Sequence, residues 1–388
     1  MSEVHYHSAR CVSCGKTLPM ENLLPVCPDC GEKLDLLLDF EALGKAREQI
    51  ESFPDFHMGR YAPLLPLPGL GAMAYGIGGT PLLFAGRLGE AIGAPGLFLK
   101  DDTRNPSASL KDRATLAVLL AAREQGAETV ATASTGNAGA SLSALAARLG
   151  MKAVVYTPAS APPAKLEQIR AHGAKLVRVD GNYDRAYELC AEDCLKNNWI
   201  SRSTGFNPWC TEGKKTVALE IAEQLGWTAP DLVYVPTGDG SILGAVHKGF
   251  SDLLQLGILT SMPRLVAVQA EGSAAIHDAW KEERDIQPVS SDTLADSISV
   301  DMPADGTKAL RALRKSKGFA ITVSDPEILG AMSRLARLEG VLAEPAAAAS
   351  LAGLSRAVKD GLQDSTQKAV CLVTGHGLKD REALERLP

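Results

Sequence analysis

The chain has 388 residues, 45% hydrophobic and 22% charged, with a formal net charge of −6 at pH 7. This length and composition predict a folded protein of two domains, and the acidic balance argues against a nucleic-acid partner. No apolar run of 18 or more residues occurs, so no membrane partner is expected. The N-terminus lacks the pattern of a secretory signal, and we therefore expect a cytoplasmic protein with reduced thiols.

Four of the eight cysteines form two C-x-x-C-G pairs near the N-terminus: Cys11 with Cys14, and Cys27 with Cys30. Each pair places two thiolates on one side of a tight turn, and four thiolates suit tetrahedral Zn²⁺ in a closed structural site. Residues 1–35 are therefore predicted to form a zinc-ribbon-like element in which these cysteines are the metal ligands. The alternative is a set of reduced thiols or a disulfide.

After this element the pattern becomes that of an α/β protein. A helix is expected at 39–51, a proline-rich linker at 54–68, and a strand at 97–100 before a helix that follows Lys111. Strands and helices then alternate, as in parallel sheets built from βαβ units. The expected strands of this block are 130–133, 153–156 and 175–179, and the expected helices are 138–149, 163–172 and 182–196.

The alternation continues to the end of the chain. The expected strands are 232–235, 265–269 and 369–373, and the expected helices are 211–225, 241–256, 326–337 and 345–357. The sequence thus predicts an α/β fold with two domains of twisted, mostly parallel sheet flanked by helices, and the small N-terminal ribbon. Residues 120–208 are expected to form a small α/β domain, and residues 36–119 with 209–388 a large one.

Four short motifs lie at expected junctions between strands and helices. They are Ser109-Leu110-Lys111-Asp112-Arg113, Ser134-Thr135-Gly136-Asn137, Gly238-Asp239-Gly240-Ser241-Ile242 and, after the last strand, Thr374. A lysine amine, an amide-bearing turn, a glycine-rich loop before a helix and a hydroxyl are the parts that a pyridoxal phosphate site needs.

These motifs in this order resemble the fold-type II (tryptophan synthase β-like) pyridoxal phosphate enzymes, and most closely the threonine synthases. The likeness runs from about Gly76 to the C-terminus, and the run Thr-Gly-His-Gly-Leu-Lys-Asp at 374–380 is its most specific part. The resemblance implies that Lys111 forms the Schiff base and then removes the substrate's Cα proton. It also implies that Asn137 contacts the ring 3′-oxygen.

The remaining roles follow from the same resemblance. The loop Ser134-Thr135-Gly136 would receive the substrate carboxylate, and the backbone of Gly238, Asp239, Gly240, Ser241 and Ile242 would hold the cofactor phosphate. Because like charges repel, the Asp239 carboxylate is expected to point away from that phosphate. Thr374 would face the pyridine nitrogen, and a neutral hydroxyl there favours elimination or replacement over transamination.

The resemblance weakens where a threonine synthase binds the phosphate of O-phosphohomoserine. Thr204 and Gly205 stand where the family has Asn-Ser, Cys210 replaces an arginine, and Ile242 replaces an asparagine. An arginine fork binds phosphate well, whereas a thiol does not. We expect Thr204, Gly205 and Cys210 to line the substrate site, and O-phosphohomoserine to be a poor substrate.

The leading interpretation is a threonine synthase-like lyase or synthase that acts on a small L-amino acid by β/γ elimination or replacement, breaking a carbon–oxygen or carbon–nitrogen bond. If another group, such as Lys165 or Lys214, replaces the arginine, the protein is a threonine synthase itself. One alternative is an ammonia-lyase or dehydratase for serine, threonine, hydroxyaspartate or diaminopropionate. Another is a non-catalytic pyridoxal phosphate-binding protein whose ribbon docks a partner. Fold-level analogy predicts a homodimer.

Overall fold

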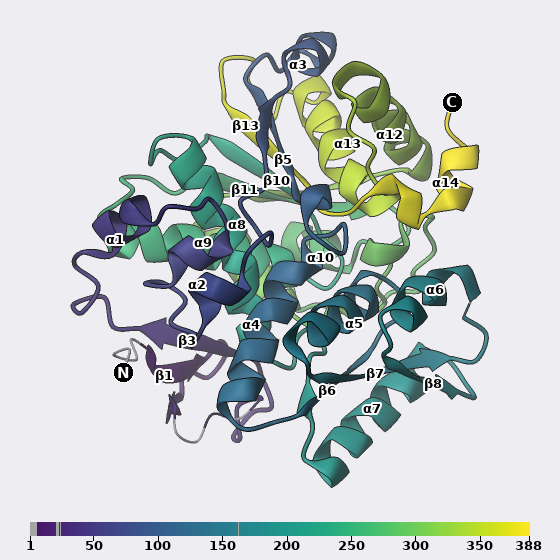
Figure 1. Ribbon diagram of the computed structural model, residues 1–388. Helices are drawn as coiled ribbons and strands as arrows, with labels where there is room; N and C mark the ends of the chain where they lie inside the picture. The colour runs from purple at the N-terminus through teal and green to yellow at the C-terminus, as the bar shows by residue number, and fades with distance from the viewer. Residues whose placement is uncertain (1–5, 21–22, 24, 162) are drawn as a thin grey trace. The chain divides into compact units, whose positions relative to one another are not determined.

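A computed structural model of the chain describes residues 6–20, 23, 25–161 and 163–388, without the side chains of 163–165. The chain divides into two compact units. Figure 1 labels their elements and colours the chain by residue number. Unit 1 comprises Met1–Gly79 and Asn105–Thr216, and unit 2 comprises Thr80–Arg104 and Val217–Pro388. The packing thus groups 36–79 and 105–119 with unit 1, and the domain boundaries given above stay a prediction.

The N-terminal part of unit 1 is a small antiparallel sheet in the order β2-β1-β3. Its strands are β1 (Tyr6–Cys11), β2 (Thr17–Pro19) and β3 (Leu34–Leu38). The register sets Cys11 opposite Leu34, and the alternate residues Leu34, Leu36 and Leu38 are buried. Cys11 ends β1, Cys14 follows it, and the pair Cys27 and Cys30 precedes β3, which confirms a ribbon-like element at this end of the chain.

The second sheet of unit 1 is parallel throughout, in the order β8-β7-β6-β9. Its strands are β6 (Thr129–Ala133), β7 (Lys152–Pro158), β8 (Lys175–Val179) and β9 (Ile200–Ser201). Its helices are α4 (Lys111–Glu124), α5 (Asn137–Leu149), α6 (Pro163–Ala171) and α7 (Tyr183–Asn197). The chain reverses its direction across the sheet at β8, so right-handed crossovers put α5 and α7 on opposite faces (Figure 1).

Unit 2 is built on a six-stranded sheet in the order β12-β11-β10-β13-β5-β4, parallel except for β4. Its strands are β4 (Leu82–Phe84), β5 (Leu97–Asp101), β10 (Leu232–Pro236), β11 (Arg264–Ala270), β12 (Phe319–Val323) and β13 (Ala369–Val373). Its helices are α3 (Gly86–Ile92), α9 (Ser241–Gln255), α10 (Ala275–Lys281), α11 (Gly306–Lys315), α12 (Asp325–Glu339), α13 (Pro345–Lys359) and α14 (Arg381–Glu385). The two parallel sheets with their helices confirm the predicted fold class.

Helix α13 packs on β10 to β13, whereas α9 and α11 pack on β10 to β12. The opposite direction of the crossovers puts these two groups on opposite faces of the sheet. Helix α8 (Trp209–Gln224) begins in unit 1 and ends in unit 2. The remaining short helices are α1 (Ala46–Ser52), η2 (Met58–Tyr61), α2 (Leu70–Met73), η3 (Asp102–Arg104), η4 (Asp296–Ile298) and η5 (Gly377–Lys379). Among the described residues, no helix is long and apolar enough to cross a membrane.

One predicted helix is much shorter in the structure. Helix α1 begins at Ala46, not at Asp39, because the Asp39 side chain accepts hydrogen bonds from the backbone of Glu41 and Ala42. Such an Asx turn competes with helical hydrogen bonding. The linker 54–68 is also not featureless, since it contains η2.

A buried ion pair lies inside unit 2. The Lys100 Nζ and the Glu220 Oε2 are 2.6 Å apart, and both side chains are fully buried. Lys100 also donates to the Thr80 carbonyl and the Gln224 Oε1. We predict that Lys100→Met lowers the free energy of unfolding by about 3–5 kcal/mol, because it leaves the Glu220 charge buried and unpaired.

Urea unfolding measures this effect. The exposed pair Lys152–Glu128 provides the control, since Lys152→Met should cost less than about 1 kcal/mol. Equal losses in the two variants would contradict the importance of the buried pair.

Candidate active site

The predicted site residues fall into one set in each unit. In unit 1 they are Lys111, Ser134, Thr135, Gly136, Asn137, Thr204, Gly205 and Cys210, and in unit 2 they are Gly238, Asp239, Gly240, Ser241, Ile242 and Thr374. Apart from Lys111, which starts α4, both sets follow the carboxyl ends of parallel strands, the edge where ligands bind in open α/β sheets.

Lys111 is the first residue of α4. The turn before it is held by Asp112, which is fully buried and accepts hydrogen bonds of 2.6 Å from both the backbone and the hydroxyl of Ser107. Ala108 has a φ of +58°, a conformation that costs energy in a residue with a Cβ. A strained turn fixed by buried hydrogen bonds directly precedes the predicted Schiff-base lysine.

The loop at 134–137 connects β6 to α5. The Ser134 backbone donates to the Tyr156 carbonyl, and the Gly136 backbone donates to the Ser134 hydroxyl at 3.2 Å. A Cβ added at Gly136 would meet nothing within 4 Å, so open space adjoins the N-terminus of α5. A helix N-terminus facing open space suits a carboxylate or another anion.

Lys111 and Asn137 start two helices that pack against one another. Helices α4 and α5 are in contact, and the Ser141 hydroxyl donates to the Thr115 Oγ1 at 2.7 Å. Thr115 and Ser141 each lie four residues, or about one helical turn, after the two predicted site residues. The structure therefore brings the first turns of α4 and α5 together within unit 1.

Arg202 is a charged residue of this region that lies outside the motifs identified in the sequence. Its side chain is fully buried, its Nε donates to the Thr115 Oγ1 at 3.1 Å, and one Nη donates to the Thr204 Oγ1 at 3.2 Å. Its other Nη is buried and has no hydrogen-bond partner among the described residues. Its place two residues before Thr204 is the one local signal that could have drawn attention to it.

Cys210 lies against the same arginine. Its thiol is buried and is 3.5 Å from the Arg202 carbonyl, to which it donates. Because β9 pairs in parallel with β6, the segment Arg202–Gly205 follows the same sheet edge as Ser134. The unit 1 residues predicted to contact substrate therefore share one edge, with the guanidinium of Arg202 beside Thr204.

In unit 2 the glycine-rich loop joins β10 to α9. An added Cβ at Gly238 would lie 2.8 Å from the Ile298 Cα, and one at Gly240, where φ is +85°, would lie 2.8 Å from the Asp305 carbonyl oxygen. Both positions therefore require glycine. Ser241, which is buried, and Ile242, which is half-buried, form the first turn of α9.

The Asp239 carboxylate turns back to the start of α9, and its direction relative to the cofactor phosphate stays a prediction. Its Oδ1 accepts a hydrogen bond of 2.9 Å from the Ser241 backbone, at the N-terminus of α9. The reason is the unpaired N–H groups of a helix start, which attract a nearby carboxylate. This carboxylate thus uses one donor of the predicted phosphate cradle.

Thr374 follows β13, the neighbour of β10 in the sheet, so it emerges at the same edge as the glycine-rich loop. Its side chain is buried. An added Cβ at the next residue, Gly375, would meet the Glu344 carboxylate at 2.3 Å, and the Glu344 backbone donates to the Gly375 carbonyl. The buried Glu344 therefore packs against the residue after Thr374.

The four N-terminal cysteines form a cluster. Their sulfur atoms lie within 4.8 Å of one another, with Cys11 3.5 Å from Cys30 and Cys14 3.6 Å from Cys27. A tetrahedral zinc site with Zn–S bonds of 2.3 Å separates its sulfurs by about 3.8 Å. Burial raises the pKa of the Cys11 thiol, but backbone hydrogen bonds at Ser13 and Cys14, together with side-chain hydrogen bonds to Cys30 and Cys14, outweigh it and lower the pKa to about 7. The cluster can hold a metal.

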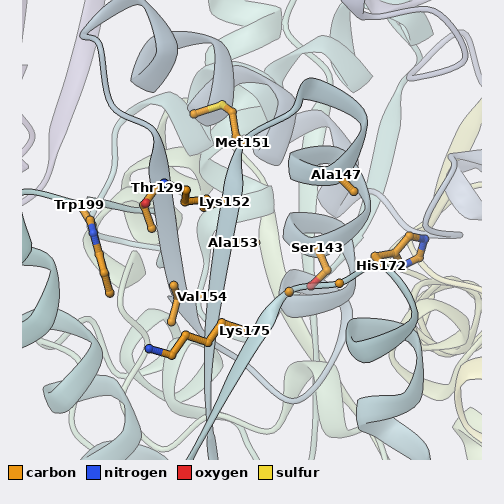
Figure 2. Close-up of a pocket in the computed structure, with 12 residues that line it drawn as sticks. Thr129, Ser143, Ala147, Met151, Lys152, Ala153, Val154, His172, Lys175 and Trp199 are labelled. Carbon is orange, nitrogen blue, oxygen red and sulfur yellow. The ribbon is translucent and has the colours of Figure 1, made fainter.

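A surface cavity of about 350 Å³ lies elsewhere in unit 1, and Figure 2 shows its lining residues. It is lined by Thr129, Lys152 and Lys175, which begin β6, β7 and β8, and by Trp199. This is the amino edge of the sheet, opposite to the edge of Ser134. The cavity contains no predicted site residue.

Comparisons with known proteins agree with these motifs. Residues 73–375 match the family profile of pyridoxal-phosphate dependent enzymes. The chain is 37% identical to the threonine synthase of Methanocaldococcus jannaschii over 97% of this chain and 94% of that protein. It is 38% identical to the threonine synthase of Methanosarcina acetivorans over 98% of this chain and 93% of that protein.

Solved structures show the same fold. The processed form of threonine deaminase isoform 2 from Solanum lycopersicum covers 90% of this chain and 93% of its own, with a TM-score of 0.70 and 20% identity. The match to a fungal L-serine ammonia-lyase from Rhizomucor miehei covers 80% of this chain and 98% of that chain, with a TM-score of 0.69 and 23% identity. The family profile and the curated relatives together show that the chain belongs to the threonine synthase family of pyridoxal phosphate-dependent enzymes, and it is a carbon–oxygen lyase.

Proposed function

We propose that the chain is a threonine synthase that uses a phosphorylated substrate, O-phosphohomoserine. The observation that supports this is the buried guanidinium of Arg202, which lies beside Thr204 and Cys210 and has no ion pair among the described residues. A buried charge without a counterion is costly, and a bound phosphate would supply one. Arg202 thus takes the place of the arginine that Cys210 replaces, and we revise the expectation that O-phosphohomoserine is a poor substrate.

The residues present fit pyridoxal phosphate. Gly238 and Gly240 have no room for a side chain, so this part of the loop before α9 offers backbone groups to a ligand. Open space adjoins Gly136. We propose that the backbone of 238–242 holds the phosphate, with Asp239 yielding its hydrogen bond, that Asn137 contacts the ring oxygen, and that the Thr374 hydroxyl faces the ring nitrogen. When bound, the cofactor stabilises negative charge that develops at the substrate Cα.

The other residues act on the substrate. The Lys111 amine accepts the Cα proton, and its place at the start of α4 is fixed by the buried Asp112 and Ser107 pair. The loop Ser134-Thr135-Gly136 binds the carboxylate at the start of α5, through N–H groups other than that of Ser134, which already donates to the Tyr156 carbonyl. Arg202, with the hydroxyl of Thr204, binds the leaving phosphate, and Cys210 and Gly205 shape the wall beside it.

A panel of L-amino acids followed by absorbance spectroscopy tests this function. The panel contains O-phosphohomoserine, homoserine, O-phosphoserine, serine, threonine, diaminopropionate and hydroxyaspartate. We expect the visible band to change at the lowest concentration with O-phosphohomoserine. If an unphosphorylated member changes it at a lower concentration than any phosphate ester, the proposal is wrong.

A second candidate is an ammonia-lyase or dehydratase for an unphosphorylated amino acid. The observation that favours it is Cys210, whose buried thiol offers no bidentate phosphate contact. Release of ammonia and a 2-oxo acid from serine, threonine, diaminopropionate or hydroxyaspartate would support this function. A homodimer in the cytoplasm stays a prediction, and sedimentation as a monomer at micromolar concentration would contradict the dimer.

We further propose that the metal of the Cys11–Cys14–Cys27–Cys30 cluster is zinc. Elemental analysis should find about one zinc per chain, because four thiolates form a closed tetrahedral site. Removal of zinc by a chelator should loosen residues 6–38 and leave cofactor content unchanged, since no ribbon residue belongs to the predicted cofactor site. Protein grown with ample zinc but containing none would contradict the assignment, and loss of cofactor on chelation would contradict the separation.

A further inference from the structure

A residue of the ribbon reaches the start of α8. Tyr6, at the first position of β1, is 3% exposed, and its hydroxyl donates to the Glu212 carboxylate. The Lys215 Nζ is 2.6 Å from the same Glu212 oxygen, and both of these side chains are fully buried. The Lys215 Nζ also lies 3.5 Å from the Tyr6 oxygen and 5.6 Å from the centre of its ring.

The same tyrosine packs against the residue before Cys210. The rings of Tyr6 and Trp209 meet edge to face, with their centres 5.3 Å apart and an interplanar angle of 87°. Trp209 and Cys210 are the first two residues of α8, Glu212 lies in the same first turn, and Lys215 lies in the next turn. One side chain of the ribbon therefore contacts three residues in the first two turns of α8.

This part of α8 also contacts the helix of Lys111. A Cβ added at Gly213 would lie 2.2 Å from the Arg113 carbonyl oxygen, so the two helix backbones touch. The Arg113 guanidinium donates to the Thr216 Oγ1 at 3.1 Å. The start of α8 is therefore packed directly against the first turn of α4.

We propose that Tyr6 is a positioning residue for the substrate site, through which the ribbon holds the start of α8 in place. This inference rests on the proposed function in one respect, namely that Cys210 and the preceding segment bind the substrate side chain. Cys11, at the opposite end of β1, belongs to the metal cluster, so the metal fixes one end of the strand whose other end carries Tyr6. The metal then affects substrate binding without contacting substrate.

The physical basis is the buried ion pair. Two charges removed from water need every remaining hydrogen-bonding position filled, and the Tyr6 hydroxyl fills one on Glu212 and accepts from Lys215. Without that hydroxyl the pair draws in water or shifts toward other partners, and α8 begins less rigidly. None of the predicted cofactor residues belongs to this network.

The test uses the holoenzyme with Tyr6→Phe, which removes one hydroxyl and keeps the ring. The matched control is Tyr75→Phe, the same change at a tyrosine that is 69% exposed. Hydrogen exchange of peptides that cover residues 207–216 is measured first, because it does not depend on the substrate. The KM and kcat for O-phosphohomoserine, or for the best substrate of the panel, are measured second.

We expect Tyr6→Phe to speed amide exchange in 207–216 and to raise KM roughly tenfold, with kcat changed less than threefold and cofactor content unchanged. Chelation of the metal in the natural chain should produce the same changes, which keeps the test decisive if Tyr6→Phe folds poorly. Unchanged exchange in 207–216, or faster exchange with an unchanged KM for the best substrate, overturns the inference. Failure of O-phosphohomoserine as substrate leaves the exchange result intact and overturns only the proposed function.

Discussion

Replacement of Lys111 by alanine should abolish covalent attachment of the cofactor to the chain. Borohydride reduction of the natural protein should fix pyridoxal phosphate on the peptide that contains Lys111, because only an amine within bonding reach of the aldehyde is trapped. Activity should fall by about 10³-fold or more, since general acid–base catalysis alone contributes roughly 10²- to 10⁴-fold. Mass spectrometry of the reduced peptides and steady-state kinetics measure the two effects.

The matched control is Lys196→Ala, at an exposed lysine in the last turn of α7. This variant should keep both trapping and activity. Cofactor trapped at a different lysine in the Lys111→Ala protein would show that the proposed assignment is wrong.

The second large effect concerns Arg202. We expect Arg202→Met to raise the KM for O-phosphohomoserine by roughly 100-fold, because two charge-assisted hydrogen bonds contribute about 1.5–3 kcal/mol each. Binding of L-threonine, which has no phosphate, should change less than about threefold. Arg202→Lys keeps the charge and loses the fork, so its KM should lie between those of the natural protein and of Arg202→Met.

The control for this prediction is Arg185→Met, at an exposed arginine of α7 that pairs with Glu188 and Glu192. It should leave both ligands unaffected. If Arg202→Met weakens the binding of O-phosphohomoserine and of L-threonine by the same factor, Arg202 supports the fold and does not bind the phosphate.

Much of the fold was predictable because its strands are apolar and its helices carry local signals. The last strand, 369–373, has the bounds that its apolar run predicts. Helix α7 starts after Asn182, whose side chain accepts from the Arg185 backbone as an N-cap. Both signals lie within a few neighbouring residues, so a single sequence reveals them.

The elements that escaped prediction depend on distant partners. Strand β9 has only two residues, and β12 pairs with β11 across a connection of about fifty residues that was assigned no element. The buried pair of Lys100 and Glu220 joins residues 120 positions apart. No local pattern identifies such contacts, because each residue alone has the character of an ordinary surface charge.

The candidate site follows the same division. The motifs around Lys111 and Asn137 were visible, because turns between strands and helices have local sequence signals. Arg202 was missed, because its position in the site is fixed by hydrogen bonds to Thr115 and Thr204, and Thr115 lies on a separate helix. The hydrogen bond from the Ser241 backbone to Asp239 was not predicted, because repulsion from a phosphate was considered and the attraction of the α9 N-terminus was not.

We propose that this chain converts a phosphorylated amino acid to threonine. The purified holoenzyme is incubated with O-phosphohomoserine, and inorganic phosphate and L-threonine are determined in the same samples. We expect equal amounts of both, formed at equal rates and with no ammonia. Absence of phosphate release, together with ammonia and a 2-oxo acid formed from an unphosphorylated amino acid, would contradict it.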